Sequence, residues 1–205
     1  MAYRYRSKLQ ADITSRSGKL LIKLALAFVL STMLASSLQA QQRDNASEAV
    51  TGLKAYAAFK SGNYEQARKI WEQLAEKGNT TAMINLANLF QQGKGVAEDQ
   101  AHALKYIVDA ARLGDSRAQY ELGIEYEKGI LVPRDIDKAA MWLHKSAIQG
   151  DSDGQFAYAV MLATAYGKGL AQASEQQRLA AKAWFKKAAS NGHPDAAAYI
   201  DILSR

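Results

Sequence analysis

Residues 103–129, with the sequence ALKYIVDAARLGDSRAQYELGIEYEKG, contain the end of one amphipathic run, a break and the start of another. Apolar residues three and four positions apart before Gly114 predict an α-helix with one buried face. Glycine readily ends a helix in the left-handed conformation, and Asp115 can cap the helix that follows. Ala118 and Leu122 then restart the same spacing. The stretch therefore predicts two helices joined by a tight turn.

Copies of this stretch make up most of the chain. Equivalent break glycines occur at Gly78, Gly114, Gly150 and Gly192, at intervals of 36, 36 and 42 residues. A period in this range is typical of helical hairpins stacked into a solenoid, in which each hairpin buries its apolar face on its neighbours. The sequence therefore predicts an all-α fold, a solenoid of stacked helical hairpins.

The break glycines divide the folded part, residues 47–205, into five segments. We expect a lead-in hairpin, three repeats and a single capping helix, with the bounds 47–78, 79–114, 115–150, 151–192 and 193–205. Most of the predicted helices are preceded by a side chain that can accept a hydrogen bond from a free helix amide. These capping residues are Asn63 (with Gln66), Asn79, Asp99, Asp115, Asp135, Asp151, Ser174 (with Gln177) and His193, which precedes Pro194 at the first helical position.

The third repeat is six residues longer than the other two. Aligning Leu162 and Ala163 with Leu86 and Ala87 places four of the extra residues before them, which is close to one helical turn. We therefore expect an extra turn on the first helix of this repeat and a longer loop after that helix. In the last helix Asp201 stands at the stacking position, where a charge ends the array.

The first 40 residues have the order of a secretory signal peptide: basic residues, an apolar run at 24–34, and small residues up to Ala40. The run is short for a membrane span, so we expect cleavage after Ala40 or, alternatively, after Ser37. The basic region is long, which keeps open a second possibility, an uncleaved anchor in the inner membrane. The polar residues 41–46 then predict a short linker.

Charge and cysteine content narrow the function classes. The 205 residues carry a net charge of +6, and the first 40 contain six Lys or Arg but only one acidic residue. A nucleic-acid binder carries its basic residues on the folded part, so this distribution argues against that class. The absence of cysteine excludes a disulfide framework, a thiolate metal site and a cysteine nucleophile.

A set of small and aromatic positions recurs in phase in all three repeats. In the first repeat these positions are Ala82, Leu86, Ala87, Phe90, Gly93, Gly95, Ala103, Tyr106, Ala110, Ala111 and Gly114. The pattern resembles the Sel-one-like repeat, an α/α relative of the tetratricopeptide repeat, over about residues 50–203. Three positions depart from it: Leu131 replaces the second loop glycine, Ser146 interrupts the alanine pair, and Gly154 replaces an alanine. The resemblance implies a right-handed superhelix whose first helices line a concave, partner-binding surface.

The resemblance also indicates which polar side chains would face such a partner. The polar positions off the core face of the first helices are Asn85, Asn88, Gln92, Glu121, Glu125, Lys128, Thr164 and Lys168. Spacings of three and four residues place each set on one stripe of its helix. Amide side chains can hold a peptide backbone, and Glu125 or Lys128 can select charge. An ordinary solvated helix face is the alternative interpretation.

We expect no catalytic residue, metal site or cofactor. His102, His144 and His193 are not in a metal-binding spacing, and no nucleophile or phosphate-loop motif occurs. The main hypothesis is a non-enzymatic periplasmic or secreted scaffold that binds a protein or peptide partner. We expect no nucleic-acid partner, and membrane contact only if the leader, residues 1–40, is retained. The alternatives are an envelope hydrolase acting on peptidoglycan or a β-lactam, and a membrane-anchored subunit of an envelope machine.

Overall fold

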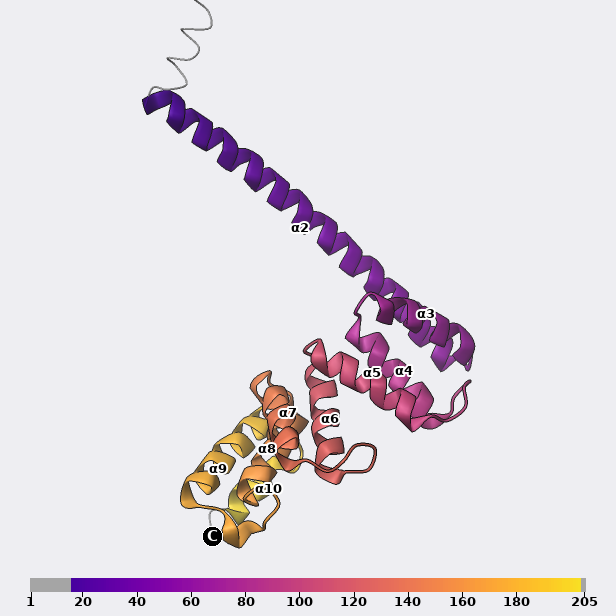
Figure 1. The fold of residues 1–205 in the computed structure, drawn as a ribbon, viewed down its shortest axis with the longest axis vertical. Helices are drawn as coiled ribbons and strands as arrows, with labels where there is room; N and C mark the ends of the chain where they lie inside the picture. The colour runs from indigo at the N-terminus through magenta and orange to yellow at the C-terminus, as the bar shows by residue number, and fades with distance from the viewer. Residues whose placement is uncertain (1–15, 204–205) are drawn as a thin grey trace, which may run out of the picture. The chain divides into compact units, whose positions relative to one another are not determined.

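The computed structural model describes the backbone of residues 16–203 and the side chains of residues 23–24, 26–169 and 171–203. The first 15 residues of the predicted signal peptide and the last two of the predicted capping helix lie outside this range. The described residues form the following helices (Figure 1): α2 (Arg16–Lys60), α3 (Tyr64–Glu76), α4 (Thr80–Gln92), α5 (Gln100–Arg112), α6 (Ser116–Lys128), α7 (Ile136–Ile148), α8 (Ser152–Ala163), the 3-10 turn η1 (Leu170–Gln172), α9 (Glu175–Ser190) and α10 (Ala196–Ile202).

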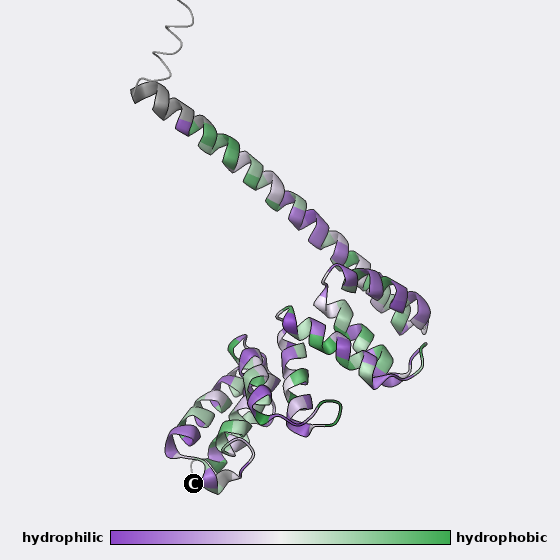
Figure 2. Ribbon diagram, viewed as in Figure 1, coloured by the Kyte–Doolittle hydropathy of each residue, from purple (hydrophilic) through white to green (hydrophobic). Residues whose placement is uncertain are grey.

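The chain divides into two units, residues 1–51 and 52–205, and each is described by itself. The described part of the first unit is helical, and its large apolar side chains between Leu24 and Leu38 are exposed. Figure 2 shows this apolar stretch of α2 followed by a hydrophilic one. Residues 41–46, where we expected a linker, are helical and continue α2. Within residues 16–203, no helix combines the length and apolar character that crossing a membrane requires.

The second unit is a series of helical hairpins. Helices α4 and α5, α6 and α7, and α8 and α9 pack as pairs, and each pair packs on the next through the α5–α6 and α7–α8 contacts. Helix α3 packs on α4, and α10 packs on α9. Sequential packing of this kind confirms the all-α solenoid predicted from the 36-residue period.

Small residues allow the helices to approach closely at the repeated positions. Ala82 and Ala118 are fully buried, as are Leu86 and Leu122 one turn further along their helices. A Cβ atom added at Gly123 would lie only 2.7 Å from Cγ of Leu143 on the neighbouring helix α7. The side chain of Leu143 therefore fills the space that glycine leaves open, and any larger residue at position 123 would push α6 and α7 apart.

The predicted helix caps are present at seven of the helix starts. The side-chain oxygen of each capping residue accepts a hydrogen bond from the backbone N–H three residues later, which satisfies a free amide of the first turn. Ser174 and Gln177 complete a reciprocal capping box. The seven residues are Asn63, Asn79, Asp99, Asp115, Asp135, Asp151 and Ser174.

The third repeat differs from our prediction, because α8 has no extra turn. Helix α8 has 12 residues and ends at Ala163, whereas α4 and α6 have 13. The next residue, Thr164, bonds its hydroxyl back to the carbonyl of Val160, and Ala165 and Tyr166 adopt φ angles of +49° and +58°. Such left-handed residues end the helix. The connection after α8 is longer, as predicted, and the other added residues lie in α9, which has 16 residues.

The final helix also begins later than predicted. Helix α10 starts at Ala196, and Pro194 lies in a turn rather than at the first helical position. The imidazole Nδ1 of His193 accepts a hydrogen bond from the backbone N–H of Asp195 at 3.2 Å. Since this bond reaches only two residues ahead, it closes a local turn before the helix can begin.

Candidate functional site

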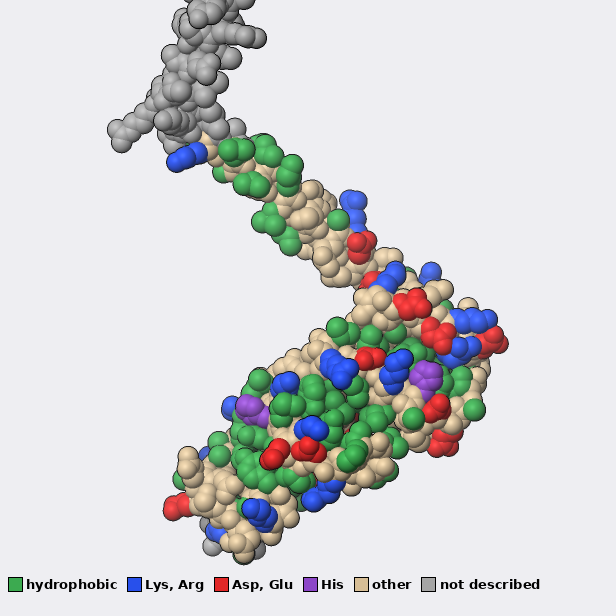
Figure 3. All heavy atoms as spheres, in the orientation of Figure 1, with side chains coloured by type: hydrophobic (Ala, Val, Ile, Leu, Met, Phe, Trp, Pro, Cys, Tyr) green, Lys and Arg blue, Asp and Glu red, His purple; other side chains and the backbone are tan. Residues whose placement is uncertain are grey.

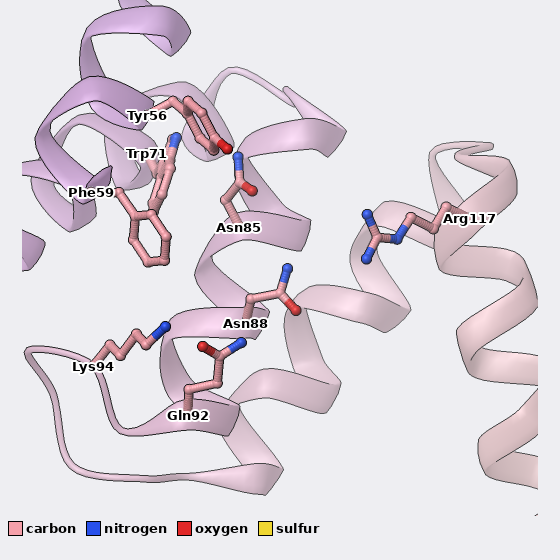
Figure 4. A pocket seen from close by; sticks show the side chains of 8 residues that line it. All are labelled: Tyr56, Phe59, Trp71, Asn85, Asn88, Gln92, Lys94 and Arg117. Atoms are coloured by element: carbon pink, nitrogen blue, oxygen red, sulfur yellow. The ribbon is translucent and has the colours of Figure 1, made fainter. Parts of the chain in front are cut away.

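A pocket of about 380 Å³ opens on α4 in the second unit (Figure 4). Its walls come from the end of α2, from α3 and α4, from the loop after α4, and from the start of α6. The lining residues are Tyr56, Phe59, Trp71, Asn85, Asn88, Gln92, Lys94 and Arg117. The pocket therefore joins parts of the lead-in hairpin and of the first two repeats.

Helix α4 supplies a row of three amide side chains to this pocket. Asn85, Asn88 and Gln92 are spaced by three and four residues, so they share one helix face. Leu86 and Leu89 on the other face are fully buried and hold α4 in the core. All three predicted amide residues thus line one cavity. No protein hydrogen bond of their side chains occurs among the described contacts, and each amide can both donate and accept.

Aromatic side chains form the wall beside Asn85. The rings of Tyr56 and Phe59 lie 6.4 Å apart, and Phe59 lies 5.7 Å from the ring of Trp71. Trp71 is only 2% exposed, whereas Tyr56 is 49% exposed. Trp71 is therefore part of the core, and Tyr56 offers apolar surface to the pocket.

Lys94 enters the pocket from the loop between α4 and α5. Its ammonium group lies 5.2 Å from the centre of the Phe59 ring, a cation–π contact that holds the side chain against the aromatic wall. The next residue, Gly95, has a φ of +69°, and a Cβ atom there would collide with the side chain of Tyr64. Gly95 thus lets the loop approach the start of α3, and this close approach places Lys94.

Arg117 reaches the pocket from α6 and is paired with Glu121. Its Nε donates to Oε1 of Glu121 at 3.1 Å, with the Arg117 side chain 62% exposed and that of Glu121 24% exposed. Burial raises the pKa of the Glu121 carboxyl, although Arg117 acts to lower it. The carboxylates of Asp115 and Asp151 raise that pKa further. Glu121 is therefore a partly buried acid beside other acids.

Glu125 and Lys128 lie further along α6. Glu125 occupies the position of Leu89 and Met161 in the neighbouring repeats, and those two residues are buried in the core. The Oε2 atom of Glu125 is enclosed and has no hydrogen-bond partner among the described residues. Lys128 is exposed on the last turn of α6. Neither residue lines the pocket on α4.

Thr164 and Lys168 do not lie on the first helix of the third repeat, contrary to the sequence interpretation. Helix α8 ends before them, and the Thr164 hydroxyl is bonded to carbonyls of Val160 and Met161. Lys168 is exposed in the turns that follow. We had placed them on the helix because we aligned Leu162 with Leu86, whereas Tyr158 stands at the same distance from its break glycine as Leu86.

Five of the eight lining residues were not among the predicted site residues. Tyr56, Phe59 and Trp71 come from the lead-in hairpin, in which we had predicted no site residue. Lys94 stands between two glycines in the loop, a local signal that could have identified it. Arg117 carries no such signal, because its position depends on how α6 packs.

The three histidines pack against aromatic rings. His102 stacks on Phe90 with ring centres 4.2 Å apart, and His193 stacks on Phe156 at 4.0 Å. His144 lies 4.8 Å from the ring of Tyr158. All three histidines therefore take part in aromatic packing. On the face shown in Figure 3, basic and acidic side chains are interspersed over the repeats rather than gathered into a basic patch.

Similarity to known proteins agrees with this architecture. A crystal structure of a Sel1 repeat protein from Oxalobacter formigenes is 33% identical, with a TM-score of 0.60, covering 68% of this chain and 39% of that one. The "Exopolysaccharide production negative regulator" of Rhizobium leguminosarum bv. viciae is 30% identical over 157 residues, which is 70% of this chain. The "DAP3-binding cell death enhancer 1" of Rattus norvegicus is 36% identical over 91 residues, 44% of this chain and 18% of that protein.

The chain spans 57% of the length of the Rhizobium relative. The family model for the Sel1 repeat matches residues 56–79, 80–115, 116–151 and 152–193, which together make up more than half of the chain. Each match covers one helical hairpin or most of one, and the four follow one another without a gap. The chain therefore belongs to the Sel1 repeat family.

Proposed function

We propose that this protein is a non-enzymatic scaffold of the bacterial cell envelope, and that it binds a protein or peptide partner over α4 and α6. The observation that carries the proposal is the pocket on α4, in which three unbonded amide side chains face an aromatic wall. Side-chain amides pair with peptide N–H and C=O groups, and exposed aromatic side chains supply apolar contact area. Both features are those of a binding surface.

The predicted site residues on α6 extend this surface. Glu121, Glu125 and Lys128 follow Arg117 along one side of the helix, at spacings of three and four residues. Since Arg117 lines the pocket, a partner segment that leaves the pocket toward α6 meets these charged groups next. Similarity also supports a scaffold function, because the rat relative is named for binding another protein.

We place this scaffold outside the cytoplasm because of its leader. The apolar side chains from Leu24 to Leu38 are exposed, and an exposed apolar run of this length requires either removal or a nonpolar environment. Cleavage after Ala40 removes the run and leaves a mature chain that begins at Gln41. Retention of the leader would instead anchor the scaffold in the inner membrane.

The test is site-specific photo-crosslinking in cells. A photoreactive amino acid replaces Gln92, which is exposed at the pocket, and in a matched control it replaces Lys105, which is exposed on α5. We expect a discrete crosslinked protein from position 92 that is absent from position 105 and is lost in the Asn85→Ala, Asn88→Ala double variant. Amino-terminal sequencing of the captured chain should begin at Gln41.

Three results would contradict these proposals separately. Identical crosslinks from positions 92 and 105 would reject the pocket as the binding surface. An amino terminus at Met1 would reject cleavage and leave the anchored form. Turnover of muropeptides or of a β-lactam by the purified chain would reject the non-enzymatic assignment in favour of the hydrolase.

A further inference from the structure

We propose that the pocket on α4 recognises an acidic side chain, Asp or Glu, within an extended partner segment, and that Lys94 is the residue that reads it. This inference rests on the proposed function and names the chemistry of the partner.

The pocket has two cations and no carboxylate in its lining. Arg117 is already paired with Glu121 at 3.1 Å. Lys94 has no carboxylate partner among the described residues, and its ammonium group makes a cation–π contact with the Phe59 ring. An ammonium group that is partly buried against a ring loses hydration, and a ligand carboxylate restores the lost interactions. A ligand that complements the charge of the pocket therefore carries a single negative charge.

Lys94 is held in place before any partner binds. The left-handed Gly95 brings the loop against Tyr64, and the cation–π contact with Phe59 restrains the ammonium group. Restraining a lysine in advance lowers the side-chain entropy that binding would otherwise cost. The loop glycine thus links the local sequence to the recognition of charge.

The next repeat does not reproduce this arrangement. The positions 36 residues after Lys94, Arg117 and Asn85 hold Ile130, Asp153 and Glu121. An apolar residue and two acids replace two cations and an amide. A carboxylate is therefore favoured in the pocket on α4 and repelled at the equivalent positions of the next repeat. The contrast fixes the register of an acidic residue in the bound segment.

The amide row indicates an extended chain that passes through the pocket. Residues 85 to 92 span roughly 10 Å of helix at a rise of about 1.5 Å per residue. Three residues of an extended chain cover roughly the same length, at about 3.3 Å each. Lys94 and Arg117 lie on opposite sides of the amides in Figure 4, and Arg117 belongs to the next hairpin. A side-chain carboxylate within the segment, next to an aromatic residue that contacts Tyr56, fits this geometry.

The experiment is a selection from a random heptapeptide library, displayed with both peptide ends joined to the carrier, on the purified full-length chain in mild detergent. We expect enrichment of Asp or Glu beside an aromatic residue. A selected peptide is then synthesised with blocked ends, together with a version in which Gln replaces the acidic residue, and both are titrated by fluorescence anisotropy.

Charge reversal at position 94 gives the decisive comparison. Lys94→Glu should weaken binding of the acidic peptide about tenfold or more, the scale of one charge-assisted contact, and should bring it to or below the level of the Gln peptide. The matched control, Lys105→Glu, makes the same charge change on the outer face of α5 and should leave binding unchanged. Circular dichroism confirms that both variants fold.

The outcomes separate the two proposals. Enriched peptides without an acidic residue, or equal binding of the acidic and Gln peptides, would overturn the inference while leaving the scaffold function intact. No enrichment, with a partner still crosslinked from position 92, would have the same meaning. No enrichment together with no crosslinked partner would overturn both.

Discussion

The α5–α6 and α7–α8 junctions are built from the same helix positions but are closed by different side chains. At the first, Ala110 and Ala118 are both fully buried. At the second, the equivalent residues are Ser146 and Gly154, and a Cβ atom at Gly154 would collide with the Ser146 hydroxyl. The larger residue on one helix is thus offset by the smaller one on the other. The two departures from the repeat motif, Ser146 and Gly154, therefore compensate for each other in size.

A second difference concerns the side chains that join the end of the second helix in each repeat to the turn at the preceding break glycine. In the second repeat, Gln149 donates to the carbonyl of Gly114 and to Gln119, which in turn donates to the carbonyl of Ala111. In the third repeat, Asn191 and Gln155 make the matching bonds to Gly150 and Ala147.

The first repeat has apolar residues at both of these positions. Met83 replaces the buried glutamine, and Leu113 lies against Gly78. The repeats therefore share a backbone arrangement, but these two positions make hydrogen bonds in the second and third repeats and hold apolar residues in the first. The comparison teaches that these positions change in pairs, because an amide left without its partner in a buried site is costly.

The largest expected effect comes from removing the compensation at the α7–α8 junction. Gly154→Ala forces the new methyl group into the Ser146 side chain, and we expect a loss of about 2 kcal/mol in the free energy of unfolding. Adding Ser146→Ala recreates the alanine pair of the preceding junction and should recover most of this loss. Urea unfolding followed by circular dichroism measures all three chains.

The single variant Ser146→Ala serves as the control for this pair. The Ser146 hydroxyl is buried and has no hydrogen-bond partner in the described structure, so its removal should change stability little. If the double variant were no more stable than Gly154→Ala alone, the two positions would not be coupled and the comparison of the junctions would fail.

A smaller effect is expected from breaking the amide chain in the second repeat. Gln149→Leu leaves Gln119 and the Gly114 carbonyl without a donor, which should cost about 1 kcal/mol and lower the Tm by about 2–4 °C. Adding Gln119→Met reproduces the apolar closure of the first repeat and should restore part of the Tm. Scanning calorimetry provides the measurement, and additive losses in the double variant would argue against paired closure.

The smallest effect concerns the charge at position 121, where the first repeat has Asn85. Because burial raises the pKa of Glu121 above its unfolded value, its stabilising contribution is present at low pH and is lost as pH rises through the folded pKa. Glu121→Asn should therefore gain stability relative to the wild type between pH 4 and pH 7. The difference should be roughly 0.5 kcal/mol, since the side chain is partly exposed and paired with Arg117.

Urea midpoints of both chains at the two pH values test this expectation. The Arg117→Ala variant, measured in parallel, separates the effect of the ion pair from that of burial. A wild-type chain that gains stability over the variant as pH rises would show that the ion pair with Arg117, rather than burial, controls Glu121.

The sequence by itself determined where the helices of the three repeats begin and that their repeated small residues, such as Ala82 and Ala118, face inward. Asp115 and Asn79 bond to amides three residues away, so such caps depend on local sequence and could be identified from it. The period of 36 residues likewise identified the stacked hairpins, because each repeat must bury the same face on its neighbour.

Only the tertiary structure decided the composition of the pocket, the end of α8 and the pairing of Ser146 with Gly154. Asn85 was predicted as a site residue, but its neighbours Tyr56 and Arg117 are distant in sequence and come from other hairpins. Such contacts depend on how closely the helices approach, and a change of one methyl group alters that distance. The repeat motif specifies which residues face the core, whereas packing between hairpins determines which side chains meet.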